Sequence, residues 1–145
     1  MSNPWIRLVT QFHKKFGLHI ENMLNAFSSS IPSDLMLDRV ELRQDLVDEE
    51  HEELNVQLEI AKAFLGANQH VPIEVRREIL DAIVDSIYVL IGMAITFGFN
   101  LEGAFKEVHA SNMSKLGDGD KPIYRSDGKV MKGPHYKPPY LDPYI

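Results

Sequence analysis

The fold is decided by the sequence IEVRREILDAIVDSIYVLIGMAITF, residues 73–97. Its first two turns are polar, and apolar residues then occupy nearly every face of a helix. A helix that is apolar all round is normally buried among other helices. The charge-free part, residues 86–99, is 14 residues long, whereas a membrane span needs about 20. The segment therefore predicts the core helix of a soluble all-α protein.

Three further helices are predicted around this one. Asn3 and Pro4 are typical of an N-cap followed by proline at the first helical position, and Gly17 is typical of a helix end. A long helical pattern covers about residues 34–65, and a last helix begins after Asn100 and runs to about residue 116. The expected fold is an all-α bundle of four to five helices.

The C-terminal segment has a different pattern. Ser126-Asp127-Gly128 predicts the turn of a hairpin, and the four prolines within residues 133–145 predict an extended, Tyr-rich tail. We expect a helical domain over residues 1–116. Residues 117–145 should pack on that bundle or on a neighbouring subunit.

Composition excludes several classes of function. The chain has 145 residues, of which 15 are basic and 21 acidic, and the net charge of −6 argues against a nucleic acid polymer as partner. The absence of cysteine excludes disulfides, thiol catalysis and Cys-ligated metals. The N-terminus lacks the apolar core of a secretory signal. We therefore expect a cytoplasmic protein with no membrane partner.

The acidic stretch DEEHEE, residues 48–53, lies within the long helical pattern. Glu49 and Glu53 are one turn apart on the same face, and Glu50 is about a third of a turn away. Like charges at this spacing destabilise a helix by roughly a few tenths of a kcal/mol. A solvated helix face is the ordinary explanation for one such acid, but a cluster needs a compensating cation.

The core helix carries a second acidic set. Glu78, Asp81 and Asp85 lie within about 60° of one another on the helix, and apolar residues surround the two aspartates. Burying an unpaired carboxylate costs several kcal/mol. Two facing acidic stripes therefore predict a divalent metal site, and ligation by oxygen alone favours Mg²⁺ or Mn²⁺.

The order of these acids resembles a known pattern. EEHEE at 49–53 followed by EILD at 78–81 is similar to the E-E-x-x-E … E-x-x-D motif of the all-α nucleoside triphosphate pyrophosphohydrolases. That superfamily includes MazG-type enzymes, dimeric dUTPases and phosphoribosyl-ATP pyrophosphohydrolase. The resemblance covers nearly the whole chain, and the tail PIYRSDGKVMKGPHYKPP, residues 122–139, is typical of a MazG-like subgroup.

The resemblance implies Mg²⁺-dependent cleavage of a nucleoside triphosphate between its α- and β-phosphates. Two or three Mg²⁺ ions, replaceable by Mn²⁺, would be held by Glu49, Glu50, Glu53, Glu78 and Asp81. Glu50 or Glu53 would orient or deprotonate the attacking water. Asp85 is an outer or alternative ligand, because in many MazG-type enzymes the motif aspartate directly precedes the apolar run.

Candidate substrate-binding residues lie outside the acidic stripes. His109, Asn112 and Lys115 share a broad face of the last helix and suit sugar and phosphate oxygens, although Lys115 could simply complement the helix C-terminus. The further phosphate candidates in the tail are Lys121, Arg125, Lys129 and Lys132. Phe12 and Phe16, with His13 between them, could stack on a base, or they could belong to the core.

Two other functions stay open at this point. Phosphoribosyl-ATP hydrolysis would use the same carboxylates, and a non-catalytic helical adaptor or metal-dependent regulator would use the bundle surface. Whichever function holds, the helix over residues 73–97 has more apolar surface than four helices can cover. A homo-oligomer, dimer or tetramer, is therefore expected.

Overall fold

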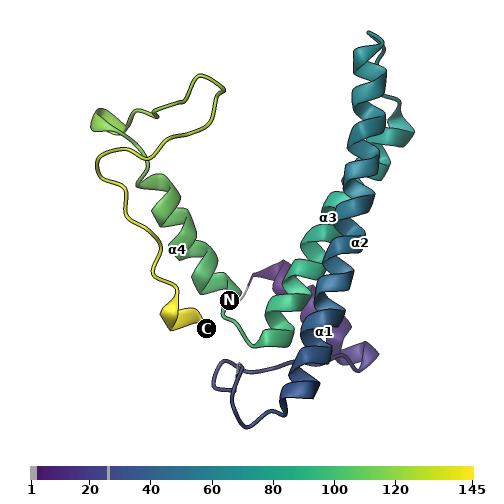
Figure 1. Ribbon diagram of the computed structural model, residues 1–145, viewed down its shortest axis with the longest axis vertical. Helices are drawn as coiled ribbons and strands as arrows, with labels where there is room; N and C mark the ends of the chain where they lie inside the picture. Colours follow the sequence, from purple (N-terminus) through teal and green to yellow (C-terminus); the bar gives the residue numbers. More distant parts are fainter. Residues whose placement is uncertain (1–2, 26) are drawn as a thin grey trace. The chain divides into compact units, whose positions relative to one another are not determined.

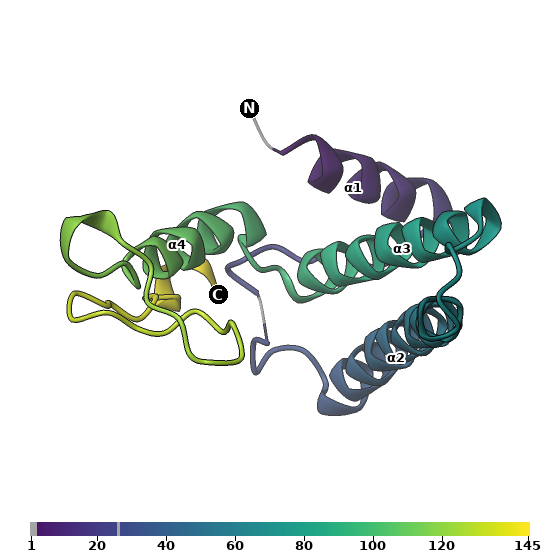
Figure 2. The ribbon, with the colours of Figure 1, turned by 90° about the horizontal axis from the view of Figure 1, so that it is seen from above.

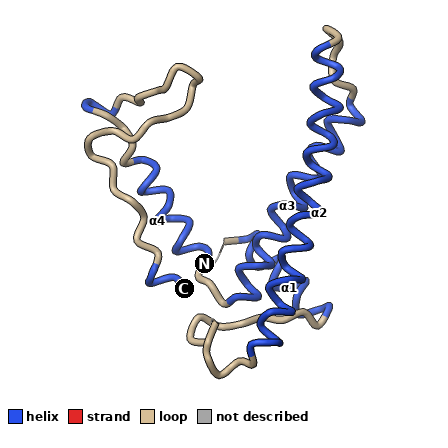
Figure 3. The backbone as a smooth tube through the Cα atoms, viewed as in Figure 1, coloured by secondary structure: helices blue, strands red, loops and turns tan. Residues whose placement is uncertain are grey.

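The computed structural model describes residues 3–25 and 27–145 of the chain. Within these residues the regular structure is entirely helical, with no β-strand (Figure 3). The helices are α1 (Pro4–Phe16), α2 (Ser33–Gly66), α3 (Ile73–Phe97) and α4 (Leu101–Met113), and two short 3-10 helices, η1 (Asp118–Asp120) and η2 (Asp142–Tyr144), lie in the tail. The all-α class predicted from the sequence is confirmed.

The chain divides into two compact units, residues 3–98 and residues 99–145. The first unit contains α1, α2 and α3. The second contains α4 together with the tail, so that the expected boundary between residues 116 and 117 falls inside it.

Helix limits follow from local capping. The side chain of Asn3 accepts a hydrogen bond of 2.9 Å from the N–H of Trp5 at the start of α1, and that of Asn100 accepts one of 3.0 Å from Gly103 at the start of α4. Gly98 ends α3 in the left-handed region, with φ of 78°. A Cβ at Gly98 would lie 2.6 Å from the carbonyl oxygen of Asn22. Only glycine therefore fits where the connector crosses the end of α3.

In the first unit α2 and α3 run side by side as a long pair (Figure 1). Seen from above, α3 lies between α1 and α2 (Figure 2). The buried apolar side chains of the described residues are Val9, Ala61, Ala82, Ile91, Ala94 and Phe97. The core of this unit is therefore small, and α1 and α2 leave much of the apolar surface of α3 uncovered.

The exposure of α3 is greater than the sequence predicts. Only 28% of its most apolar 18-residue window is buried. By length and composition α3 is also the one helix among the described residues that could cross a membrane, a test that core helices of soluble proteins pass as well.

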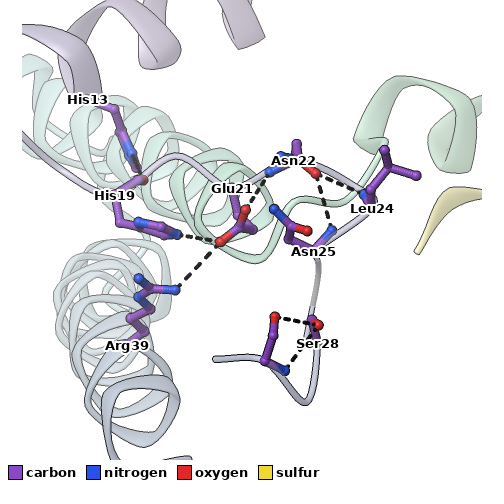
Figure 4. Close-up of polar contacts among 9 residues, drawn as sticks. His13, His19, Glu21, Asn22, Leu24, Asn25, Ser28 and Arg39 are labelled. Carbon is purple, nitrogen blue, oxygen red and sulfur yellow. Dashed lines mark hydrogen bonds and ion pairs between the residues drawn. The ribbon is translucent and has the colours of Figure 1, made fainter. Parts of the chain in front are cut away.

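The connector after α1 is tied to all three helices of the first unit, and Figure 4 shows its contact with Arg39 of α2. The Nδ1 atom of His13 lies 2.9 Å from the carbonyl oxygen of His19. The carboxylate of Glu21 lies 3.0 Å from Nε2 of His19 and 3.7 Å from the guanidinium of Arg39 on α2. The N–H of Glu21 donates to the carbonyl of Ile95 on α3. The backbone N–H of Asn22, the largest cause, and the His19 side chain lower the pKa of Glu21, so the network keeps its negative charge.

In the second unit the tail runs back along α4. The carbonyl of Lys137 accepts a hydrogen bond of 2.8 Å from the hydroxyl of Ser111, and the N–H of Tyr140 donates to the carboxylate of Glu107 at 3.0 Å. The carbonyl of Tyr144 accepts from the N–H of Asn100. These bonds hold an extended segment with no helical periodicity against the helix.

The turn predicted before the tail is present without a regular strand on either side. Tyr124 and Val130 form an isolated antiparallel bridge. The N–H of Gly128 donates to the carbonyl of Arg125.

Candidate active site

An acidic pocket of about 490 Å³ lies between α2 and α3. Four of the predicted metal ligands line it, two from each helix. Its lining residues are Glu49, Glu52, Glu53, Val56, Gln57, Glu78, Asp81 and Ala82. Helical spacing pairs the acids on each helix, and the packing of α2 on α3 brings these four carboxylates to one cavity.

A second pocket of about 500 Å³, which we call the aromatic pocket, lies among α1, α2 and α3. Most of its lining is apolar or aromatic, but it also receives the other two predicted acids, Glu50 and Asp85. The lining residues are Phe12, His13, Leu18, Arg43, Leu46, Glu50, Asp85, Tyr88, Val89 and Gly92.

Glu50 connects the two pockets electrostatically. Burial is the largest cause that raises the pKa of Glu50, followed by the negative charges of Asp85, Glu53, Glu49 and Asp81. The carboxylates of α2 and α3 are thus close enough to act on one another. At neutral pH this cluster concentrates negative charge in a small volume, which attracts divalent cations.

The acidic cluster fits divalent metal ions by its chemistry. Its members offer only carboxylate oxygens, the ligands that Mg²⁺ and Mn²⁺ prefer. None of the ion pairs recorded within residues 3–25 and 27–145 neutralises any of them. Across the same residues no group of three or more His, Asp or Glu side chains is converged for a metal ion.

The expected burial of the α3 aspartates is wrong in part. Asp81 is exposed, and Asp85 is half-buried. The reason is that neighbouring apolar side chains on α3 are themselves uncovered, with Leu80 62% exposed and Val84 49% exposed. Mutual repulsion within the cluster, rather than burial of Asp81, is therefore what a cation would relieve.

Two of the three predicted base-binding residues line the second pocket. Phe12 and His13 are among its lining residues, and Tyr88 of α3 contacts the Phe12 ring edge-on, with ring centroids 5.6 Å apart. Phe16 is not among them. Its ring lies 4.3 Å from that of Phe12, and the residue is 68% exposed, so it supports Phe12 from outside.

His13 and Arg43 meet at Gly92. His13 is 1% exposed and Arg43 5% exposed. A Cβ at Gly92 would lie 3.0 Å from Nε2 of His13 and 3.3 Å from an Nη atom of Arg43. Only a residue without a side chain allows both groups to approach α3 so closely.

Burial decides the protonation of this pair. Burial is the largest cause that lowers the pKa of His13, and the charge of Arg43 also lowers this pKa. The hydrogen bond to the His19 carbonyl acts in the opposite direction and raises it. Since a carbonyl can only accept, Nδ1 of His13 carries the hydrogen and Nε2 of the neutral ring is an acceptor. Burial also lowers the pKa of Arg43, but a guanidinium stays charged in proteins.

Sequence reasoning missed Arg43, Tyr88 and Gly92. The available signal was spacing, because Arg43 precedes Glu50 by seven residues and therefore lies on the same face of α2. Burial of an arginine against a glycine on another helix leaves no such signal in the sequence.

The predicted phosphate-binding residues all belong to the second unit. His109 and Asn112 are exposed on α4, and Nζ of Lys115 donates to the side-chain oxygen of Asn112 at 2.7 Å. Arg125 is paired with Asp127 in the turn, while Nζ of Lys132 lies 4.3 Å from the centre of the Tyr136 ring.

Arg125 and Lys132 thus have local partners. The phosphate-binding roles of the residues in this unit, Lys129 included, stay predictions.

Comparison with known proteins identifies the family. The profile of the phosphoribosyl-ATP pyrophosphohydrolase family matches residues 9–112, a span that contains both acidic stretches. No curated protein matches the chain. Among solved structures, 24 chains match.

One of these structures is described as a candidate NTP pyrophosphohydrolase from Exiguobacterium sp. 255-15. It is 27% identical, with 96% of this chain and 90% of that chain covered and a TM-score of 0.43.

The chain belongs to the phosphoribosyl-ATP pyrophosphohydrolase family, within the all-α, MazG-like pyrophosphohydrolases. It is accordingly an enzyme, a pyrophosphohydrolase. The hypothesis of a non-catalytic adaptor is set aside.

Proposed function

We propose that the enzyme hydrolyses a ribo- or deoxyribonucleoside triphosphate between the α- and β-phosphates, releasing the monophosphate and pyrophosphate, and so controls the cytoplasmic nucleotide pool. The observation that carries this proposal is the placement of the six acids on two pockets of the first unit. One pocket is acidic and the other is lined by aromatic and apolar side chains. The pairing suits a polyphosphate joined to a flat base.

In this proposal Glu49, Glu50, Glu53, Glu78 and Asp81 hold two or three Mg²⁺ ions, or Mn²⁺ in their place, and Asp85 is an additional or alternative ligand. Such ions would neutralise the charge that develops on the phosphate oxygens. Their binding also relieves the repulsion among the carboxylates.

Glu50 is the first candidate for orienting or deprotonating the attacking water. It is half-buried in the lining of the aromatic pocket, and burial and four neighbouring carboxylates raise its pKa before any metal binds. Glu53, which is exposed in the acidic pocket, is the second candidate for orienting the water.

The α4 unit supplies the proposed contacts to phosphate and sugar. Lys115 and Asn112 already lie side by side through their hydrogen bond, and a cation next to an amide suits a phosphate next to a sugar hydroxyl. His109 on the same helix, and Lys121, Arg125, Lys129 and Lys132 in the turn and tail, would add further donors.

We also propose a homo-oligomer, a dimer or tetramer, in which a second copy covers the exposed apolar surface of the helices. Support comes from α3, whose Leu80 and Leu90 are 62% and 50% exposed. Leaving large apolar side chains wet costs roughly 1.5–3 kcal/mol for each that could be fully buried. Association would also shield the apolar helix from a membrane.

Phosphoribosyl-ATP is the second candidate substrate. The match to the family of that description favours it, and the same carboxylates would bind its polyphosphate. The two candidates differ in the group that occupies the aromatic pocket, because phosphoribosyl-ATP carries a modified adenine.

The test is to incubate the protein with Mg²⁺ and with each ribo- and deoxyribonucleoside triphosphate, or with phosphoribosyl-ATP, and to measure pyrophosphate and inorganic phosphate separately. The proposal expects pyrophosphate and a monophosphate from at least one nucleoside triphosphate, with no orthophosphate. Glu50→Gln should lose this activity, whereas Glu41→Gln, at an exposed position of α2, should retain it. Pyrophosphate release from phosphoribosyl-ATP alone would overturn the proposal in favour of the second candidate.

A further inference from the structure

The aromatic pocket contains a cation that the proposed hydrolysis does not use. Arg43 is 5% exposed, and no hydrogen bond or ion pair to its side chain is recorded within residues 3–25 and 27–145. Its Nε atom is buried without a partner among the described residues, which costs free energy. One of its Nη atoms lies beside Gly92, which also lines the pocket, and a ligand with an acceptor at that place would pair this donor.

The lining of the pocket limits what this acceptor can be. Phe12 and Tyr88 present aromatic surfaces, and the pocket also receives the carboxylates of Glu50 and Asp85. These two negative groups disfavour a bare phosphate near Arg43. A flat, uncharged ring that carries an oxygen acceptor satisfies both the aromatic lining and the guanidinium.

His13 provides a hydrogen-bond acceptor beside the donors of Arg43. Its Nδ1–H donates to the carbonyl of His19, which leaves Nε2 as an acceptor. Nε2 of His13 and an Nη atom of Arg43 both lie within 3.3 Å of the point where a Cβ of Gly92 would be. An acceptor and a donor are thus presented next to each other at the backbone of α3.

We propose that Arg43 and His13 determine base specificity, with Arg43 donating a hydrogen bond to an oxo oxygen of the base and Nε2 of His13 accepting one from the adjacent ring N–H. Uracil, thymine, guanine and hypoxanthine present this pair of groups. Adenine and cytosine place an amino group where the oxo oxygen would be, and in the same pose that amino group directs a donor at Arg43. This inference rests on the proposed function, because a nucleotide whose phosphate lies at the acidic cluster places its base in this pocket.

The sharpest test uses two pairs of substrates that differ mainly at this edge, dITP against dATP and dUTP against dCTP. A hydrogen bond to a charged group corresponds to a preference of about 10- to 100-fold. The wild-type enzyme should therefore show kcat/KM higher by about that factor for dITP and dUTP. Arg43→Met, which keeps the length of the side chain and removes its donors, should bring both ratios close to one, mainly through KM.

Two variants control for other effects. Arg7→Met makes the same change at an exposed position of α1 that lines neither pocket and should leave both ratios unchanged. Arg43→Lys keeps the charge with a single donor centre and should give intermediate ratios; it also serves if the methionine variant fails to fold, as judged by circular dichroism.

Binding of the monophosphates dIMP and dAMP, measured by calorimetry, separates this inference from the proposed function. A protein that releases no pyrophosphate from any nucleoside triphosphate but binds dIMP more tightly refutes the proposed hydrolysis and retains the base specificity. Equal affinity for dIMP and dAMP, or a loss in Arg43→Met that is the same for all four triphosphates, overturns the inference. A uniform loss in kcat would instead indicate that Arg43 acts on the phosphates or only on the fold.

Discussion

Replacing Glu50 by glutamine should abolish turnover and, in the absence of metal, make the protein more stable. In the folded state Glu50 is half-buried and lies within the field of Asp85, Glu53, Glu49 and Asp81. A like charge at i,i+3 spacing, here Glu53, costs about 0.2–0.5 kcal/mol, and burial and the carboxylates of α3 add to this cost. Removing one charge from the cluster should therefore stabilise the apoprotein by on the order of 1 kcal/mol, which raises Tm by about 2–4 °C for a chain of this size.

The pH dependence has a definite sign. Because folding raises the pKa of Glu50, the folded state binds its proton more tightly than the unfolded state does. The contribution of Glu50 to the stability of the wild type should therefore rise as the pH falls from 7 through that raised pKa, and this contribution should be absent from Glu50→Gln. Below the ordinary pKa of a glutamate both states are protonated and the contribution no longer changes.

The measurement is thermal unfolding followed by circular dichroism, in EDTA and in Mg²⁺, with turnover recorded on the same samples. In EDTA the variant should melt above the wild type, and in Mg²⁺ the wild type should gain more than the variant because it keeps the full ligand set. Glu41→Gln is the matched control, since it removes one exposed carboxylate of α2 outside both pockets. A variant that melts lower in EDTA, or that keeps most of its kcat, would refute the reasoning.

Three further predictions concern the metal, the glycine and the tail. Mg²⁺ or Mn²⁺ should raise Tm and be required for pyrophosphate release, so full activity in excess EDTA would contradict the metal assignment. Gly92→Ala should lower the free energy of unfolding by about 1–3 kcal/mol through overpacking, partly offset by the better helix propensity of alanine. It should also raise KM, because its Cβ would press on His13 and Arg43. Denaturant unfolding and kinetics would measure the two effects, and an unchanged KM would show the contact to be irrelevant to substrate. Deletion of residues 120–145 removes the segment that is hydrogen-bonded along α4 and should raise KM for the nucleotide and weaken oligomerisation while metal still binds; unchanged KM and unchanged mass by light scattering would show the tail to be passive.

Much of the first unit was predictable because its causes are local. The limits of α1, α2 and α3 agree with the sequence to within one or two residues, since Asn3, Gly17 and Gly98 cap or end helices through their own backbone and side-chain chemistry. The fourth helix ends at Met113, shorter than the predicted limit near residue 116, because the chain there turns to meet the tail.

The acidic pocket was predictable for a similar reason. Residues 3, 4 or 7 apart on a helix share a face whatever the helix packs against. The sequence therefore placed Glu49 with Glu53 and Glu78 with Asp81. Packing of α2 on α3 then brought the two pairs to one cavity.

By itself, then, the sequence determined the helical class, the ends of most helices and the composition of the acidic faces, because capping and helical periodicity act over a few residues. Only the tertiary structure decided that Nε of Arg43 is buried with no partner in the described part of the chain, that Arg43 meets His13 at Gly92, and that Asp81 remains exposed. Burial depends on which distant segments cover a side chain. That property belongs to the packing of three helices and is not encoded in the spacing along any one of them.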